Sequence, residues 1–246
     1  MNINEVVKKV TEEVYRQIGA GADCAQPGAC SPELAGNIEH SILNPDMTRE
    51  RIVQECALAK QYRFANVCVT PYFVYEAAQA LKTSNVGVCA PVGFPQGAAS
   101  TAAKICEIKE CVANGATELD VELNIVAIKS GEFDEVKREL KAMVDAAGFS
   151  VKVKAIYEQG LLTEEEKQKT LEIIRDVGPA YVKISNALTG KAACKNDVAF
   201  VRSIVGGSVK IKIDGGIKTA AIAREILASG ADRIGCSASV AIVTGA

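Results

Sequence analysis

Short apolar or β-branched runs alternate with longer amphipathic segments along most of the chain. The short runs predict strands over Asn37 to Leu43, Asn66 to Thr70, Val86 to Ala90, Glu118 to Leu123, Ser150 to Tyr157, Ala180 to Ser185, Ser208 to Asp214 and Arg233 to Ser237. Apolar positions at helical spacing predict helices over Thr48 to Tyr62, Pro71 to Leu81, Ala98 to Asn114, Phe133 to Ala147, Thr163 to Val177, Asn196 to Val205 and Thr219 to Ser229. Strands that alternate with helices in this way are typical of parallel β/α units.

The number of these units predicts the fold. The strands are nearly continuous in Val, Ile and Leu, as expected when a parallel sheet is buried on both faces. Eight units in 246 residues favour a single (β/α)8 (TIM) barrel, with residues 1–246 as one domain. The alternative is an open doubly wound sheet, but no G-x-G-x-x-G motif opens a helix after a strand. An extra amphipathic helix and a loop are expected before the barrel, in residues 1–36.

Composition excludes several classes of function. No apolar stretch approaches the ~20 residues of a membrane helix, so we expect no membrane association. A net charge of −2 and the absence of tryptophan argue against nucleic-acid binding. Nine cysteines without a C-x-x-C pair, together with one histidine, argue against a zinc site, so we expect neither metal nor cofactor. Scattered cysteines favour a reducing compartment and the amino terminus lacks a secretion signal, which predicts a cytoplasmic protein.

Charged residues interrupt four consecutive strands in the second half of the chain. Side chains alternate between the two faces of a strand, so the charged positions of each strand share a face. These positions are Glu118, Asp120 and Glu122; Lys152 and Lys154; Lys183 with Ser185; and Lys210, Lys212 and Asp214. Charges inside a barrel are costly unless they are paired. Lys152 and Lys210 come early in their strands, so we expect them in salt bridges at the amino-terminal end of the barrel.

The remaining lysines and one acid favour catalysis. Asp120, Lys154, Lys183 and Lys212 lie centrally or late in their strands, toward the end where barrel active sites form. A lone strand lysine is usually structural, but three lysines and an acid at one mouth favour chemistry. A second ammonium and partial desolvation lower the pKa of a lysine, which can then form a Schiff base with a carbonyl substrate. The imine is an electron sink that lets a neighbouring carbon–carbon bond break or form, while Asp120 relays protons.

Glycines follow the last two predicted strands. Asp214-Gly215-Gly216 ends the seventh strand, and Gly235-Cys236-Ser237 ends the eighth. Glycine lets backbone N–H groups approach a ligand closely, and the loops after strands 7 and 8 of a barrel commonly bind phosphate. Gly-Gly alone is a weak signal because many turns contain it, but its position favours a phosphate site.

Several motifs together resemble the deoxyribose-phosphate aldolase family. They are Ile38-Glu39-His40-Ser41-Ile42-Leu43, Val67-Cys68-Val69-Thr70-Pro71, Gly93-Phe94-Pro95-Gln96-Gly97, Gly115 to Val121, Lys129-Ser130-Gly131, Lys154 with Glu158, Gly160 and Leu162, and Lys212-Ile213-Asp214-Gly215-Gly216-Ile217. The likeness extends from about Asn37 nearly to the carboxyl terminus. It implies a barrel enzyme that reversibly cleaves 2-deoxy-D-ribose 5-phosphate to D-glyceraldehyde 3-phosphate and acetaldehyde through a lysine Schiff base, in deoxyribonucleotide and carbohydrate catabolism.

The resemblance also implies residue roles. Lys183 is expected as the Schiff-base lysine, Lys212 as the group that lowers its pKa, and Asp120 as the proton relay. The expected substrate-binding residues are Lys154, Cys68, Leu43, Ser185, Gly215, Gly216 and Ser237. His40, the one histidine, is at least as well explained by a structural role.

The segment after Lys183 departs from the family pattern. The family usually has Thr-Ser-Thr-Gly there, followed by a glycine-rich stretch, whereas this chain has Ile184-Ser185-Asn186-Ala187 and then Leu188 to Ala193. Glu39 replaces an aspartate, and Ser237-Ala238-Ser239 stands where the family has Ser-Ser-Gly. Because the lysines and the acid are retained, these departures bear on the substrate more than on the reaction.

Two alternatives to the aldolase hypothesis remain. One is a Schiff-base aldolase for a different phosphorylated sugar, and the other is a non-catalytic barrel that binds a phosphorylated ligand. Lys191 or Lys218 would supply phosphate charge lost from the altered segment, although either could be a solvated surface lysine. The expected partner is a small phosphorylated sugar, and the expected assembly is a homodimer or homotetramer.

Overall fold

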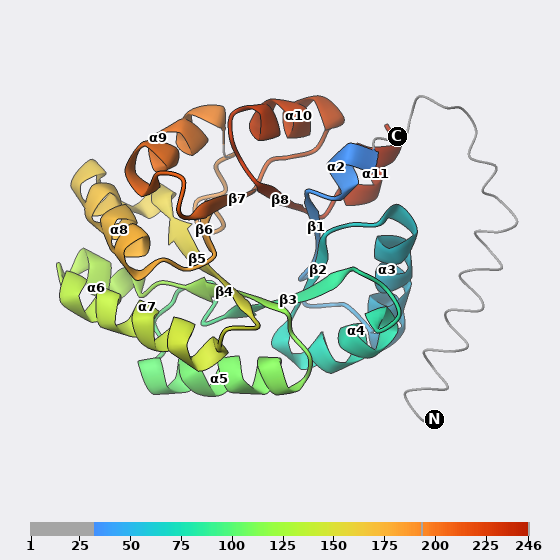
Figure 1. Cartoon of the computed structure of the whole chain (residues 1–246), viewed down its shortest axis with the longest axis horizontal. Coiled ribbons are helices and arrows are strands. Elements are labelled where there is room, and N and C mark those ends of the chain that lie inside the picture. The colour runs from blue at the N-terminus through green and yellow to red at the C-terminus, as the bar shows by residue number, and fades with distance from the viewer. Residues whose placement is uncertain (1–31, 193, 246) are drawn as a thin grey trace, which may run out of the picture.

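The computed structural model describes residues 32–192 and 194–245, and its centre is a closed barrel of eight parallel strands (Figure 1). The strands are β1 (Ile38–Ile42), β2 (Asn66–Val69), β3 (Gly87–Val92), β4 (Glu118–Glu122), β5 (Lys152–Glu158), β6 (Tyr181–Ser185), β7 (Lys210–Asp214) and β8 (Arg233–Cys236). They follow one another around the ring in chain order, and β8 pairs with β1. The (β/α)8 barrel prediction is therefore confirmed, and the open-sheet alternative is wrong.

Helices surround the ring of strands (Figure 1). They are α2 (Pro32–Ala35), α3 (Arg49–Tyr62), α4 (Val74–Leu81), α5 (Thr101–Ala113), α6 (Ile125–Lys129), α7 (Phe133–Ala147), α8 (Glu164–Val177), α9 (Lys195–Val205), α10 (Ala220–Ala228) and α11 (Ser239–Thr244), with 3-10 turns η1 (Pro71–Phe73) and η2 (Gln159–Leu161). Each predicted helix is found within a few residues of its predicted bounds. The short helices α6 and α11 were not predicted, because two turns carry too little periodicity. The helix expected near the amino terminus lies outside the described residues.

Local hydrogen bonds explain where the helices begin. Thr48 and Thr219 cap α3 and α10 by accepting backbone N–H groups in the first turn. Thr163 and Glu166 form a capping box at the start of α8. The helix expected to begin at Asn196 begins instead at Lys195, because the Asp197 carboxylate accepts the N–H of Cys194 at 2.8 Å.

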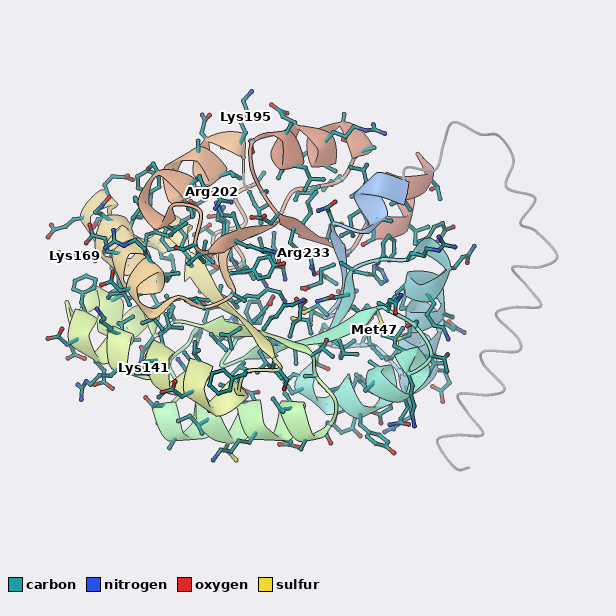
Figure 2. All side chains as sticks on the ribbon, viewed as in Figure 1. Met47, Lys141, Lys169, Lys195, Arg202 and Arg233 are labelled. Carbon is teal, nitrogen blue, oxygen red and sulfur yellow. The ribbon has the colours of Figure 1, made fainter. Side chains whose placement is uncertain are left out.

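Strand alternation divides the interior into an apolar shell and a charged centre. Leu119, Val121, Ile211 and Ile213 face the helices and are fully buried in the hydrophobic core. Figure 2 shows Arg233 inside the ring of strands, whereas Lys141, Lys169 and Lys195 project from the outer helices. Among the described residues, no helix combines the length and apolar character that a bilayer span requires.

His40 has a structural role, as the sequence interpretation allowed. It faces outward from β1, where its Nε2 lies 2.8 Å from Glu55 Oε2 on α3. Its Nδ1 lies 3.0 Å from Ser239 Oγ, at the start of α11. The ring therefore joins the first strand to two surrounding helices.

A buried ion pair supports the carboxyl end of β4. Lys104 on α5 is fully buried, and its Nζ donates to Glu139 Oε2 on α7 at 2.9 Å and to the Glu122 carbonyl at 3.0 Å. Its side chain also packs beneath Gly93, where an added Cβ would lie 2.9 Å from Lys104 Cε. The pair thus ties two helices to the loop that follows β3 and to the end of β4.

We expect Lys104→Met to lower the free energy of unfolding by about 3 to 5 kcal/mol, because the buried Glu139 carboxylate would lose its cation. Denaturant unfolding followed by circular dichroism measures this change. Lys141→Met is the matched control, since the Lys141–Asp145 pair is on the surface, where such pairs contribute about 0 to 1 kcal/mol. Equal stabilities of the two variants would contradict a structural role for the buried pair.

Candidate active site

Three lysines and one aspartate meet inside the barrel. Strand register places Asp120 beside Lys154 and Lys183 beside Lys212, because each pair occupies matching positions on neighbouring strands. Asp120, Lys154 and Lys212 are fully buried, and Lys183 is 3% exposed. The structure therefore brings together the four charged residues that the sequence singled out.

Asp120 contacts all three ammonium groups. Its Oδ1 accepts from Lys154 Nζ at 2.9 Å, and its Oδ2 accepts from Lys183 Nζ at 2.8 Å and from Lys212 Nζ at 2.6 Å. Burial opposes ionisation, but the charges of the three lysines outweigh it and hold the pKa of Asp120 well below its usual value. Asp120 is therefore an ionised carboxylate that neutralises a cluster of cations.

Glu39 on β1 completes the cluster from the opposite side of the ring. Its carboxylate is fully buried and accepts from Lys212 and, at 3.0 Å, from Lys154. In the sequence, Glu39 stands out only as a replacement for the aspartate of the family pattern, with no site role predicted for it. The signal that could have found it is an acid on the inward face of the first strand.

Thiols lie among these charges. Oxygen and sulfur atoms of Glu39, Cys68, Cys89 and Asp120 lie within 4.8 Å of one another, a spacing that could suit a metal ion. These atoms already have a cation in contact, the Lys154 ammonium. Its Nζ donates to Glu39, to Asp120 and, at 3.1 Å, to Cys89 Sγ. Burial is the main cause that raises the pKa of the Cys89 thiol well above its usual value, so the thiol is protonated. A protonated thiol is a poor metal ligand.

The early lysines occupy the other end of the barrel, as predicted. Lys152 Nζ donates to Glu118 Oε1 at 3.2 Å, which confirms its salt bridge. Lys210 has a different partner from the one expected: its Nζ lies 5.8 Å from the centre of the Tyr181 ring. Burial acts against ionisation of Glu118, but the charges of Lys154 and Arg233 hold its pKa at about 2.

The protonation of Lys183 differs from the sequence expectation. Burial acts to lower the pKa of Lys183, but the carboxylates of Asp120 and Asp214 outweigh it and hold that pKa well above the usual value. Asp214 Oδ2 lies 2.8 Å from Lys183 Nζ. In this arrangement the two acids in contact with Lys183 outweigh any lowering of its pKa by the neighbouring Lys212 ammonium.

A cavity of about 570 Å³ opens above Lys183 at the carboxyl ends of the strands. Its lining includes six of the predicted site residues: Leu43, Lys183, Ser185, Gly215, Gly216 and Ser237. Lys191 and Lys218 also line it. Asp120, Lys154, Lys212 and Cys68 are not among its lining residues. The predicted set therefore divides into a wall of the cavity and a charged layer beneath it.

Phe94 and Asp214 line the cavity but had no predicted role. Lys183 Nζ lies 5.7 Å from the centre of the Phe94 ring, which belongs to the loop after β3. Phe94 belongs to one of the sequence motifs, and Asp214 belongs both to the charged face of its strand and to the Asp-Gly-Gly motif. In neither case did spacing along the chain reveal that the residue contacts Lys183.

The unusual segment after Lys183 is held firmly at the rim. Glu158 at the end of β5 accepts the backbone N–H groups of Ala187 and Leu188, at 3.2 and 3.1 Å. Gly216, at φ +76°, leaves room for Ala192, whose Cβ would lie 2.6 Å from an added side chain. The segment therefore forms part of the cavity wall, beside the glycines that follow β7.

Glu122 is a buried acid without a counterion in contact. It is fully buried on the inward face of β4, and within the described part of the chain neither of its carboxylate oxygens has a hydrogen-bond partner. Burial is the main cause that raises the pKa of Glu122 to about 9, against the opposing charge of Lys183. The side chain is therefore a neutral carboxylic acid at pH 7.

The fold and this centre define a class of protein: a (β/α)8 barrel with a lysine-and-carboxylate site at the carboxyl ends of its strands. No family model matches the chain. It is 41% identical to deoxyribose-phosphate aldolase of Staphylococcus carnosus over 213 residues, covering 87% of this chain and 96% of the relative. It is 43% identical to deoxyribose-phosphate aldolase of Desulfitobacterium hafniense over 212 residues, covering 86% and 97% of the two chains.

A solved structure agrees with these relatives. Deoxyribose phosphate aldolase from Aeropyrum pernix, described as having a unique tetrameric structure, superposes with a TM-score of 0.80 at 26% identity, covering 96% of each chain. The chain belongs to the deoxyribose-phosphate aldolase family.

We expect the free energy of unfolding to fall as pH rises from about 5 to about 9 because of Glu122. Below its unfolded-state pKa of 4.5 the carboxyl is protonated in both states; at higher pH the unfolded chain releases the proton, whereas the folded chain retains it up to its pKa of about 9. The slope from this group is at most about 1.4 kcal/mol per pH unit.

Denaturant unfolding of Glu122→Gln at several pH values measures this effect. The variant should gain stability relative to the unsubstituted protein as pH rises across this range, because glutamine does not titrate. Glu110→Gln, at an exposed position on α5, is the control and should keep the original slope. Parallel pH profiles for Glu122→Gln and the unsubstituted protein would contradict a neutral Glu122.

Proposed function

We propose that this protein cleaves 2-deoxy-D-ribose 5-phosphate to D-glyceraldehyde 3-phosphate and acetaldehyde, reversibly, through a Schiff base on Lys183. The observation that carries the proposal is the place of Lys183: its Nζ lies between two carboxylates at the base of the cavity, with Lys212 beside it in register. The family relationship favours the same reaction.

The chemistry follows from the lysine. Once Lys183 has lost a proton, its amine attacks the aldehyde carbon of the open-chain sugar and water leaves. The resulting iminium draws electrons from the bond between the second and third carbons while the hydroxyl group on the third carbon loses its proton, which releases the phosphorylated aldehyde and leaves an enamine on Lys183. Protonation of the enamine carbon and addition of water then release acetaldehyde and the free lysine. Asp120, which contacts both Lys183 and Lys212, relays protons between them.

The residues beneath the cavity act on substrate through Lys183. Lys154 is held by Asp120 and Glu39, so its part is to fix the carboxylate that orients Lys183. Cys68, on β2, is 1% exposed and helps to keep water from this layer. Leu43 lines the wall where the sugar carbons lie.

The rim of the cavity suits the phosphate. Ser185, Gly215, Gly216 and Ser237 line it, and Thr219 caps the helix that begins beside them. Backbone N–H groups of such loops and the positive end of a helix favour an anion. Lys191 and Lys218 are exposed and line the same cavity, so they supply the charge that the altered segment lacks.

We extend the proposal to the organisation of the molecule. The chain works as one catalytic domain, in the cytoplasm, without metal or organic cofactor, and as a homodimer or homotetramer. The tetrameric relative from Aeropyrum pernix supports assembly. A lysine centre whose charges neutralise one another supports chemistry that needs no metal.

We expect Lys183→Ala to lower the rate of deoxyribose 5-phosphate cleavage at least about a thousandfold, because no imine can form. Borohydride reduction with this substrate, followed by peptide mass mapping, should place the adduct on Lys183. Lys210→Ala is the control, because Lys210 is an exposed lysine at the other end of the barrel. Full turnover by Lys183→Ala would rule out a Schiff base on Lys183. An adduct on another lysine would show that this other lysine is the nucleophile.

We expect Lys191→Ala and Lys218→Ala each to raise KM for 2-deoxyribose 5-phosphate roughly three- to tenfold, because each loses a charged contact with phosphate. Cleavage of unphosphorylated 2-deoxyribose should be unchanged. Lys195→Ala, outside the cavity and paired with Glu225, is the control. A panel of phosphorylated sugars completes the test: a different sugar turned over far better than deoxyribose 5-phosphate would favour the other aldolase hypothesis.

A further inference from the structure

Asp214 is an acid that contacts Lys183 from the cavity side. It is the last residue of β7, its side chain is 21% exposed, and it lines the cavity. Its Oδ2 lies 2.8 Å from Lys183 Nζ and 3.6 Å from Lys212 Nζ. Its Oδ1 is buried and has no hydrogen-bond partner within the described residues. One carboxylate oxygen thus touches the lysine while the other is unpartnered.

The neighbouring strand makes room for this carboxylate. Asp214 is in register with Gly235 on β8, and a Cβ added at Gly235 would lie 2.0 Å from Asp214 Oδ1. Any other residue at position 235 would push the carboxylate away from its present place. The contact between Asp214 and Lys183 therefore depends on glycine at position 235. Neither a turn nor a positive φ angle requires glycine there, because Gly235 lies within β8.

Asp120 is less suited than Asp214 to remove the first proton from Lys183. Both Asp120 oxygens already accept from buried ammonium groups, those of Lys154 and Lys212 as well as Lys183. A proton kept on Asp120 would leave two buried cations facing a neutral acid, so Asp120 can pass a proton on between the lysines but is a poor place to hold one while the imine forms. Asp214 is partly exposed and one of its oxygens has no hydrogen-bond partner among the residues that the structure describes, so a proton there disturbs fewer charges.

We propose that Asp214 is the catalytic acid–base residue of Schiff-base formation: it accepts a proton from the Lys183 ammonium and returns it to the hydroxyl group that leaves as water. This inference rests on the proposed function and assigns one of its steps. It adds a catalytic residue to the expected set of Lys183, Lys212 and Asp120.

Each step conserves atoms and charge. The Lys183 ammonium gives one proton to the Asp214 carboxylate, which leaves a neutral amine and a carboxylic acid. The amine attacks the aldehyde carbon, and a proton moves from nitrogen to the former carbonyl oxygen, which gives a neutral carbinolamine. Asp214 then protonates the hydroxyl group, the carbon–oxygen bond breaks, and the nitrogen lone pair forms the carbon–nitrogen double bond. The products are an iminium on Lys183, one water molecule and the Asp214 carboxylate.

The rate of imine formation distinguishes this role from that of a counterion. Rapid-quench borohydride trapping of the full chain with 2-deoxyribose 5-phosphate at pH 7 measures that rate on Lys183. We expect Asp214→Asn to slow it about a hundredfold, since acid–base groups contribute on the order of 10²- to 10⁴-fold. A mere counterion predicts the opposite, because loss of its charge would lower the pKa of Lys183 and increase the free amine.

Chemical rescue separates catalysis from a change in shape. Formate should restore part of the trapping rate in Asp214→Ala, in proportion to its concentration, because a small carboxylate fits the space left by the side chain. Asp145→Ala, at an exposed position on α7, is the control and should trap at the original rate with or without formate.

The outcomes distinguish the inference from the function. Trapping by Asp214→Asn at the original rate or faster overturns the inference alone, as does a slow rate in Asp214→Ala that formate leaves unchanged in a variant shown by circular dichroism to be folded. An unsubstituted protein that yields no adduct with this substrate overturns the proposed function and the inference together.

Discussion

The ion pairs of Asp120 with three buried lysines are the interaction on which the rest of the site depends. A single ammonium inside the barrel would lose more solvation energy than its packing returns, so each lysine requires a carboxylate in contact. Asp120 meets this requirement for Lys154, Lys183 and Lys212, and Glu39 adds a second acid from β1. Asp120 and the three lysines come from the consecutive strands β4 to β7, and Glu39 joins them from β1 because β8 closes the ring. Closure of the barrel thus completes the charge balance of the centre.

The ion pairs that stabilise the buried Lys183 ammonium also oppose its reaction as a nucleophile. Carboxylates that make burial of Lys183 possible also raise its pKa, whereas a nucleophilic lysine must lose a proton. The positions of the two acids, one on each side of Lys183, resolve these opposing requirements. Asp120 lies below Lys183 and is committed to buried cations, while Asp214 lies at the cavity wall with one oxygen that has no hydrogen-bond partner in the described part of the chain. Proton transfer toward the cavity changes the charge of a group that solvent reaches, and the buried network keeps its balance.

Much of the fold and the centre of the site could be predicted from local pattern. The run Glu118 to Glu122 alternates charged and apolar side chains, and in the barrel its acids face inward while Leu119 and Val121 pack in the apolar core. Period-two alternation also placed Lys183 and Lys212 on the inward face, and register then made them neighbours. Helix starts followed from capping residues such as Thr163. These features depend on a few residues in sequence, so a single chain displays them.

What sequence could not show depends on distance across the ring. Glu39 stands 173 residues from Lys212 and bonds to it only because β8 pairs with both β1 and β7 and so closes the ring between them. Alternation marks Glu122 as inward, but it does not show that the Glu122 carboxylate lacks a hydrogen-bond partner among the described residues, since the Lys104 ammonium donates to Glu139 and to the Glu122 carbonyl. Likewise, the contact of Asp214 with Lys183 depends on the missing side chain of Gly235. Charge pattern along a strand identifies which groups enter the barrel, while their protonation is set by partners that only the closed ring supplies. Chemistry in this barrel is therefore a property of the ring as a whole.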